Sequence, residues 1–148
     1  MRISGLAGAP SVALRAKVAI PPLPTDSGRL DYGILMSGLT THVLDTAHGR
    51  PAAGMAVRLL KDGRQVAGAV TNRDGRCDGP LVSGEALEAG AYRLEFEVGT
   101  YFRDLGLDLP RPAFLETVAI DFGVAEAGGH YHVPLLVSPF AYSTYRGS

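Results

Sequence analysis

The chain has 148 residues, of which 46% are hydrophobic and 20% are charged, and its formal net charge is −1 at pH 7. This composition is typical of one globular domain, and the balanced charge argues against a protein that binds nucleic acid through the phosphate backbone. No apolar run approaches the ~20 residues that a helix needs to cross a bilayer, so we expect no membrane partner. The single cysteine, Cys77, excludes an intrachain disulfide framework and a zinc site built from several cysteines.

The first 37 residues differ from the rest because they contain four prolines and no sustained hydrophobic period. Their best apolar stretch, residues 12–20, is interrupted by two basic residues, so no secretory signal is recognisable. We therefore predict a disordered extension over residues 1–37, a folded domain over residues 38–148 and a cytoplasmic location. A targeting presequence and upstream sequence translated ahead of Met36 are the alternatives.

From residue 39 onward, apolar and polar residues alternate in short runs that are separated by turn residues. Residues 55–59, 92–98, 117–122 and 131–137 each place apolar side chains on one face of a strand. The Asp-Gly pair within residues 61–64 lies between two apolar runs and indicates a hairpin. Several short strands at this spacing predict an all-β fold, an antiparallel β-sandwich.

Two short segments carry helical signals. Residues 82–89 have Ser83 as a candidate N-cap and Gly90 as a stop, and residues 101–105 are compatible with one further turn of helix. Neither segment is long enough to change the fold class.

Histidines interrupt the apolar pattern on two of the predicted strands. Thr40 and His42 share one face near the start of the domain, and His130 and His132 share a face near its end, because alternate residues of a strand point the same way. A strand histidine is most often a surface or hydrogen-bonded residue. Three of them together also allow a second interpretation, a metal site formed by His42, His130 and His132.

Three further features complete the set of chemically capable residues. Arg76 follows an Asp-Gly turn and, taken alone, is typical of a solvated charge. Cys77 lies in no motif that indicates a nucleophile. The last nine residues, 140–148, contain three aromatic residues, which predicts that this terminus docks onto the domain instead of fraying. The residues themselves therefore indicate a β-sandwich that carries histidines on its strands, but they do not identify a substrate.

Four segments in order resemble the 5-hydroxyisourate hydrolase branch of the transthyretin-like family. They are Leu39–Asp45, Thr71–Arg76, His130–Leu136 and, at the end of the sequence, Tyr145–Ser148. The final Tyr-Arg-Gly-Ser is the most specific of them, because the hormone-carrying transthyretins lack it. The resemblance runs from about residue 38 to residue 148.

The resemblance implies a fold and an assembly. It implies a transthyretin-like sandwich of two four-stranded sheets with one short helix after the fifth strand, which residues 101–105 match. It also implies a homotetramer whose active sites lie in a channel at the interface between dimers. Polar faces on the histidine-bearing strands agree with strands that line such a channel.

The implied reaction is the hydrolysis of 5-hydroxyisourate to 2-oxo-4-hydroxy-4-carboxy-5-ureidoimidazoline in urate degradation, without a metal or other cofactor. The resemblance assigns His42, Arg76, His132 and Ser148 to catalysis, His42, Arg76 and Tyr145 to substrate binding, and His130, Arg146 and Gly147 to support of the site.

These residue types suit that chemistry. A histidine can activate water near neutral pH, and either His42 or His132 fits this role while the other orients water or substrate. The fork of donors on Arg76 suits a planar, acidic, carbonyl-rich ring and a developing oxyanion. Arg146 is expected to anchor the tail by ion pairing. A carrier of small aromatic ligands without turnover and a structural interaction domain remain the alternative functions.

Overall fold

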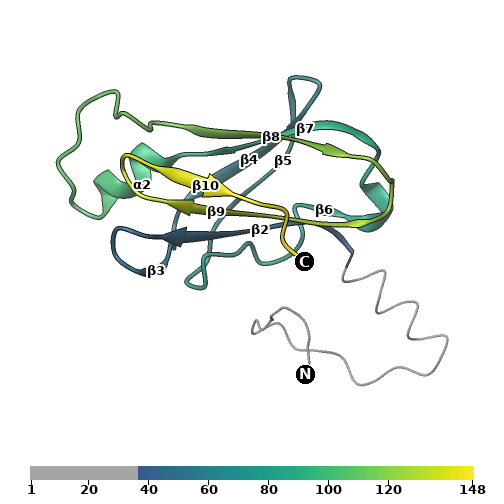
Figure 1. The fold of residues 1–148 in the computed structure, drawn as a ribbon, viewed down its shortest axis with the longest axis horizontal. Helices are drawn as coiled ribbons and strands as arrows, with labels where there is room; N and C mark the ends of the chain where they lie inside the picture. Colours follow the sequence, from purple (N-terminus) through teal and green to yellow (C-terminus); the bar gives the residue numbers. More distant parts are fainter. Residues whose placement is uncertain (1–36) are drawn as a thin grey trace, which may run out of the picture.

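The computed structural model describes residues 37–148, which form two β-sheets packed face to face (Figure 1). One sheet has the strand order β10-β9-β2-β3, with β6 also pairing with β2, and the other has the order β5-β4-β7-β8. The elements are β2 (Gly38–Asp45), β3 (Arg50–Pro51), β4 (Ala56–Lys61), β5 (Arg64–Val70), β6 (Val82–Ser83), the 3₁₀ turn η1 (Gly84–Ala86), β7 (Gly90–Phe96), α2 (Val98–Asp104), β8 (Val118–Val124), β9 (His130–Val137) and β10 (Tyr142–Thr144). The predicted extension lies, apart from Ser37, outside the described residues.

The predicted fold class is confirmed, with two differences in detail. Among residues 37–148, all strand pairings but one are antiparallel, and the exception is the central pair β2–β9, which runs parallel over eight residue pairs. The short strand β6 adds a fifth member to the sheet that contains β2. No helix among the described residues is both long enough and apolar enough to span a membrane.

The helix predicted over residues 82–89 is wrong. Val82 and Ser83 instead pair with the start of β2, and only the single turn η1 follows. The Ser83 side chain makes no capping hydrogen bond. Pairing with a neighbouring strand satisfies the backbone here, so tertiary contact outweighs a weak local helical preference.

The other helical prediction is confirmed in α2, which begins at Val98, three residues before the predicted start. Val98 was expected to end a strand, but it lies fully buried in the first turn of the helix. Tyr101 and Phe102 also face inward, so the helix closes one end of the sandwich (Figure 1).

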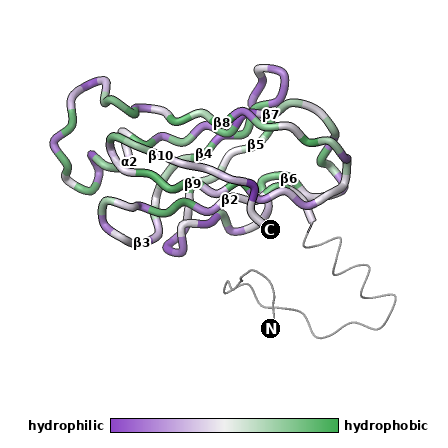
Figure 2. Tube along the Cα trace, viewed as in Figure 1, coloured by the Kyte–Doolittle hydropathy of each residue, from purple (hydrophilic) through white to green (hydrophobic). Residues whose placement is uncertain are grey.

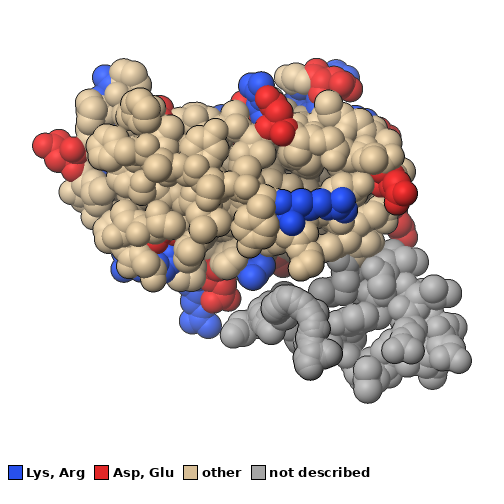
Figure 3. Space-filling view, in the orientation of Figure 1, with Lys and Arg blue, Asp and Glu red and all other residues tan. Residues whose placement is uncertain are grey.

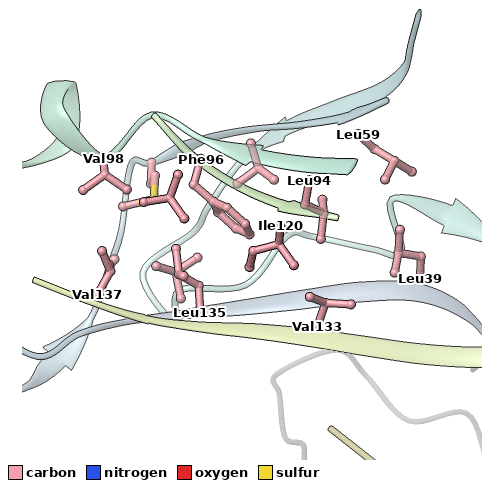
Figure 4. Packing of buried hydrophobic residues seen from close by; sticks show 14 of the residues in the cluster. Leu39, Leu59, Leu94, Phe96, Val98, Ile120, Val133, Leu135 and Val137 are labelled. Atoms are coloured by element: carbon pink, nitrogen blue, oxygen red, sulfur yellow. The ribbon is translucent and has the colours of Figure 1, made fainter. Parts of the chain in front are cut away.

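The core lies between the sheets and takes one side chain in two from each central strand. Fully buried residues include Leu39, Leu59, Leu94, Phe96 and Leu135 (Figure 4). The alternation along the chain is visible as changes from apolar to polar along the strands in Figure 2. On the face of the molecule shown in Figure 3, charged groups are scattered around a largely uncharged surface. Because inward positions are apolar, the intervening residues of β2 and β9 are left on an outer face of the sandwich.

Candidate active site

The parallel pairing of β2 and β9 brings distant polar residues together. Thr40 lies directly opposite His132, and the Thr40 Oγ1 atom is 2.8 Å from the His132 Nδ1 atom. His42 lies two residues further along the same outer face of β2. The side chains of these three residues are half-buried, whereas Leu39 and Val133 on the opposite face fill the core. The predicted sharing of one face by Thr40 and His42 is therefore confirmed.

A tight turn delivers Arg76 to the edge of β2 that faces away from β9. The Asn72 Oδ1 atom accepts a hydrogen bond from the backbone N–H of Arg76 at 3.2 Å, and the Asn72 backbone N–H donates to the Arg76 carbonyl at 2.7 Å. Gly75 has φ +74°, and a Cβ atom there would collide with the Val43 carbonyl oxygen. Only glycine adopts this conformation so close to another backbone at little cost. The turn pairs Arg76 with His42 in an isolated antiparallel bridge.

The C-terminal residues close the opposite side of the site. Strand β10 pairs with the end of β9, and the Gly147 backbone N–H donates to the His132 carbonyl at 2.8 Å. A Cβ atom on Gly147 would lie 2.5 Å from the His132 Cδ2 atom, so the tail is in close contact with the imidazole ring. The predicted docking of this terminus is confirmed, and Gly147 is the residue that permits the close approach.

Arg146 holds the tail in a way that differs from the predicted ion pair. Its guanidinium stacks over the Tyr131 ring, 4.3 Å from the centroid, and donates to the His130 carbonyl oxygen at 3.3 Å. A cation–π contact of this kind stabilises an exposed arginine without a carboxylate partner. Tyr145 and Ser148 flank this anchor with exposed side chains.

Burial and like charges keep both site histidines neutral. Burial lowers the pKa of His132 to about 4, with further lowering from electrostatic interactions with Arg76, His42 and His130. Burial and the Arg76 charge also lower the pKa of His42, although contacts with Asp74 oppose this. At pH 7 the site therefore contains two imidazoles that can accept protons.

Arg76 supplies positive charge to the same space. Burial lowers its pKa, and electrostatic interactions with Asp74 and Tyr145 act in the opposite direction. A guanidinium stays protonated throughout the physiological range, so Arg76 remains a cation. Arg76 interacts electrostatically with both His42 and His132, so the three groups lie near one another.

One sequence interpretation needs revision, and two residues make contacts that the sequence did not predict. No group of three His, Cys, Asp or Glu side chains within residues 37–148 is arranged to hold a metal ion, so the alternative site of His42, His130 and His132 is not formed. Thr40 contacts His132 across the parallel strand pair. The sequence places Thr40 on the same strand face as His42 but does not predict this contact. Asn72 belongs to the segment Thr71–Arg76 and carries a turn signal, but its hydrogen bonds to Arg76 were not predicted.

The sequence of residues 39–147 matches the HIUase/Transthyretin family. The chain belongs to this family. A curated relative named 5-hydroxyisourate hydrolase, from Ralstonia nicotianae, is 60% identical over 117 residues, which cover 76% of this chain and all of the relative. The resemblance to the hydrolase branch is therefore confirmed.

Solved structures of the family have the same fold. A 5-hydroxyisourate hydrolase from Klebsiella pneumoniae is 40% identical with a TM-score of 0.66, and the match covers 76% of this chain and all of that one. A crystal structure of (S)-allantoin synthase is 39% identical with a TM-score of 0.69, and the match covers 82% of this chain. The chain spans about half of that longer protein, 48% of its length.

Proposed function

We propose that this chain hydrolyses 5-hydroxyisourate to 2-oxo-4-hydroxy-4-carboxy-5-ureidoimidazoline. The observation that carries the proposal is the meeting of His42, Arg76 and His132 on one outer face, next to the docked tail. Two neutral bases beside a fixed cation suit the attack of water on a carbonyl of an acidic ring. The names of the curated relatives support the same reaction.

Arg76 binds the substrate and polarises the carbonyl that is attacked. The ring is planar and carries several carbonyl oxygens, which match the fixed fork of donors on a guanidinium. As negative charge develops on the carbonyl oxygen, the half-buried Arg76 stabilises it more strongly than water would. The phenol of Tyr145 lies close enough to Arg76 to influence its pKa, and in this proposal it contacts the same substrate edge.

His132 acts as the general base. It takes one proton from water while the water oxygen adds to the ring carbonyl carbon. The amide C–N bond of the six-membered ring then breaks, the former carbonyl becomes a carboxyl group, and the released nitrogen takes the proton to complete the ureido group. An anionic substrate at Arg76 offsets the charge that lowers the pKa of His132, so the base strengthens when substrate binds.

The remaining site residues have supporting roles. His42 orients the attacking water or the substrate from the strand beside Arg76. Ser148 contacts substrate or water from the end of the tail. Gly147 and Arg146 hold the tail against β9 through the contacts described above, and His130 supports them through its carbonyl oxygen.

The proposed assembly is a homotetramer in which the outer face of β2, β9 and β10 lines a channel between dimers. The half-buried state of His42 and His132 in a single chain supports this arrangement, because a second copy opposite the face would complete a substrate cavity. The small-molecule substrate is the other partner. A cytoplasmic location remains a prediction from the sequence.

A coupled assay tests the function. Urate oxidase generates 5-hydroxyisourate in the cuvette, and the decay of its ultraviolet absorbance is followed with and without this chain, with spontaneous decay as the control. We expect faster decay with the wild-type protein and near-spontaneous decay with His132→Ala. If a folded wild-type protein fails to accelerate decay, the hydrolase proposal is wrong and the carrier alternative becomes the one to test by ligand binding.

A further inference from the structure

The His132 ring is held on two edges. On one edge, the Nδ1 atom lies 2.8 Å from the Thr40 hydroxyl oxygen across the parallel strand pair. On the other edge, the Cδ2 atom is in close contact with Gly147, whose backbone N–H also binds the His132 carbonyl. Because the Thr40 contact engages Nδ1, the proposed reaction uses Nε2 as the ring nitrogen that meets substrate or water.

The hydrogen bond to Thr40 links the orientation of the hydroxyl to the tautomer of the His132 ring. A neutral imidazole has one N–H and one nitrogen with a free lone pair, and the partner of one nitrogen fixes the state of the other. A threonine hydroxyl can either donate or accept, so it can pair with either tautomer. In the proposed reaction the ring nitrogen that meets water must accept a proton. The productive arrangement therefore keeps the proton on Nδ1, toward the Thr40 hydroxyl, and the lone pair on Nε2.

We propose that Thr40 is a positioning residue for the hydrolysis, whose hydroxyl oxygen accepts the Nδ1–H of His132 and so presents an unprotonated Nε2 to the attacking water. This inference rests on the proposed function. Thr40 itself touches neither substrate nor water in this scheme. It acts by holding the ring orientation and by selecting the tautomer that can accept a proton at Nε2.

The tautomer is measured directly by two-bond ¹H–¹⁵N correlation spectra of the histidine rings at pH 7, with His132 assigned by comparison with His132→Asn. We expect Nδ1 protonated and Nε2 unprotonated in the wild type and in Thr40→Ser, which keeps the hydroxyl. In Thr40→Val, which has nearly the same shape without the hydroxyl, we expect a mixture of both tautomers. A wild-type ring protonated on Nε2 overturns the proposal.

Kinetics in the coupled assay provide the second readout. Thr40→Val should lower kcat about tenfold and change KM by less than about twofold, because substrate still binds Arg76 while the base is misaligned. Thr40→Ser should recover most of the lost kcat. Thr46→Val is the matched control, since Thr46 Oγ1 donates to the Val137 carbonyl at 3.1 Å at the far end of the same strand pair. It should leave kcat and KM unchanged.

The failure of this inference is distinguishable from failure of the proposed function. If the wild type does not hydrolyse 5-hydroxyisourate, the proposed function fails, and the spectra still decide whether Thr40 sets the tautomer. If the wild type is active but Thr40→Val keeps both its tautomer and its kcat, the positioning role is overturned while the hydrolase stands. Thermal melting of each variant shows whether a lost activity reflects unfolding, and Thr40→Ser then decides the role of the hydroxyl.

Discussion

The two sheets of the sandwich present outer faces of opposite electrostatic character. On the face of β4, β7 and β8, Arg58 forms ion pairs with Glu95 at 2.8 Å and Glu97 at 2.6 Å. Across the neighbouring strands, Arg93 binds Asp121 at 2.7 Å. Each hydrogen bond favours the charged state, raising the pKa of the arginines and lowering that of Asp121. Every one of these charges has a partner on the same surface.

The face of β2 and β9 shows the reverse. Burial is the largest influence on His42, Arg76 and His132, and it lowers the pKa of each, which disfavours the charged form in all three. The Thr40 hydroxyl, a neutral group, is the hydrogen-bond partner of His132. The comparison shows that these charges on one face are paired with each other, whereas the other face places a cation beside two neutral imidazoles. Perturbation of this kind is typical of functional sites.

Removal of Arg76 is expected to have the largest effect. Arg76→Ala should lower kcat/KM about 10³-fold, because it removes both the substrate anchor and the group that stabilises the oxyanion. Arg76→Lys should also lose most activity, since an ammonium group lacks the planar fork of donors. The coupled assay measures both variants, and thermal melting confirms that they fold. Near-wild-type turnover in Arg76→Ala would remove this residue from the mechanism.

A substitution in the tail should have the next largest effect. In Gly147→Ala, the added methyl group meets the His132 ring at Cδ2, so either the ring or the tail must shift. We expect kcat/KM to fall about 10²-fold, because a displacement of about 1 Å in a catalytic group has consequences of this size.

Gly79→Ala is the matched control for the tail substitution. Gly79 lies in a loop, and a Cβ atom there would have no neighbour within 4 Å. This variant should retain full activity. Equal activity in the two alanine variants would show that the contact between Gly147 and His132 is not needed.

The pKa of His132 predicts a moderate dependence of stability on pH. Because the folded-state pKa is about 4 and the ordinary value is 6.5, the unfolded chain binds a proton more readily than the folded chain. Protonation of His132 therefore does not reduce the free energy of unfolding above about pH 6.5, and this free energy falls progressively as the pH falls from 6.5 toward 4. His132→Asn lacks this group, so the wild type should lose stability relative to the variant over that window. Denaturant unfolding at pH 8, 6 and 4.5 measures the difference, and parallel curves would contradict the burial of the ring.

Local pattern accounts for most of the fold but for little of the site's assembly. The buried positions of Leu94 and Phe96 are predictable from the sequence, because the alternation of a strand depends only on neighbouring residues. The contact between Thr40 and His132 joins residues 92 positions apart, and its parallel register has no local signature. For the same reason Val82, which pairs with Leu39, was misread as the start of a helix.

The roles of the site residues followed from the resemblance and not from their spacing. Arg76 has the local pattern of any solvated charge after a turn, and only the backbone bridge to His42 shows why it belongs to the site. The predicted ion pair of Arg146 is wrong. Its guanidinium is held instead by the aromatic face of Tyr131 and by the His130 carbonyl oxygen. A cation–π contact with a residue on another strand has no local sequence signature.

The smallest effect is expected on the paired face, and it tests the comparison from the other side. Arg58→Ala removes a side chain that is 38% exposed and bound to two carboxylates. Ion pairs this exposed contribute about 0–1 kcal/mol, since solvent screens them and ordering the side chains costs entropy. We therefore expect unchanged kcat and KM and a change in unfolding free energy within that range, measured by urea denaturation. A loss of activity comparable to that of Arg76→Ala would show that the two faces are functionally coupled, because charge removed from one sheet would then act on chemistry at the other.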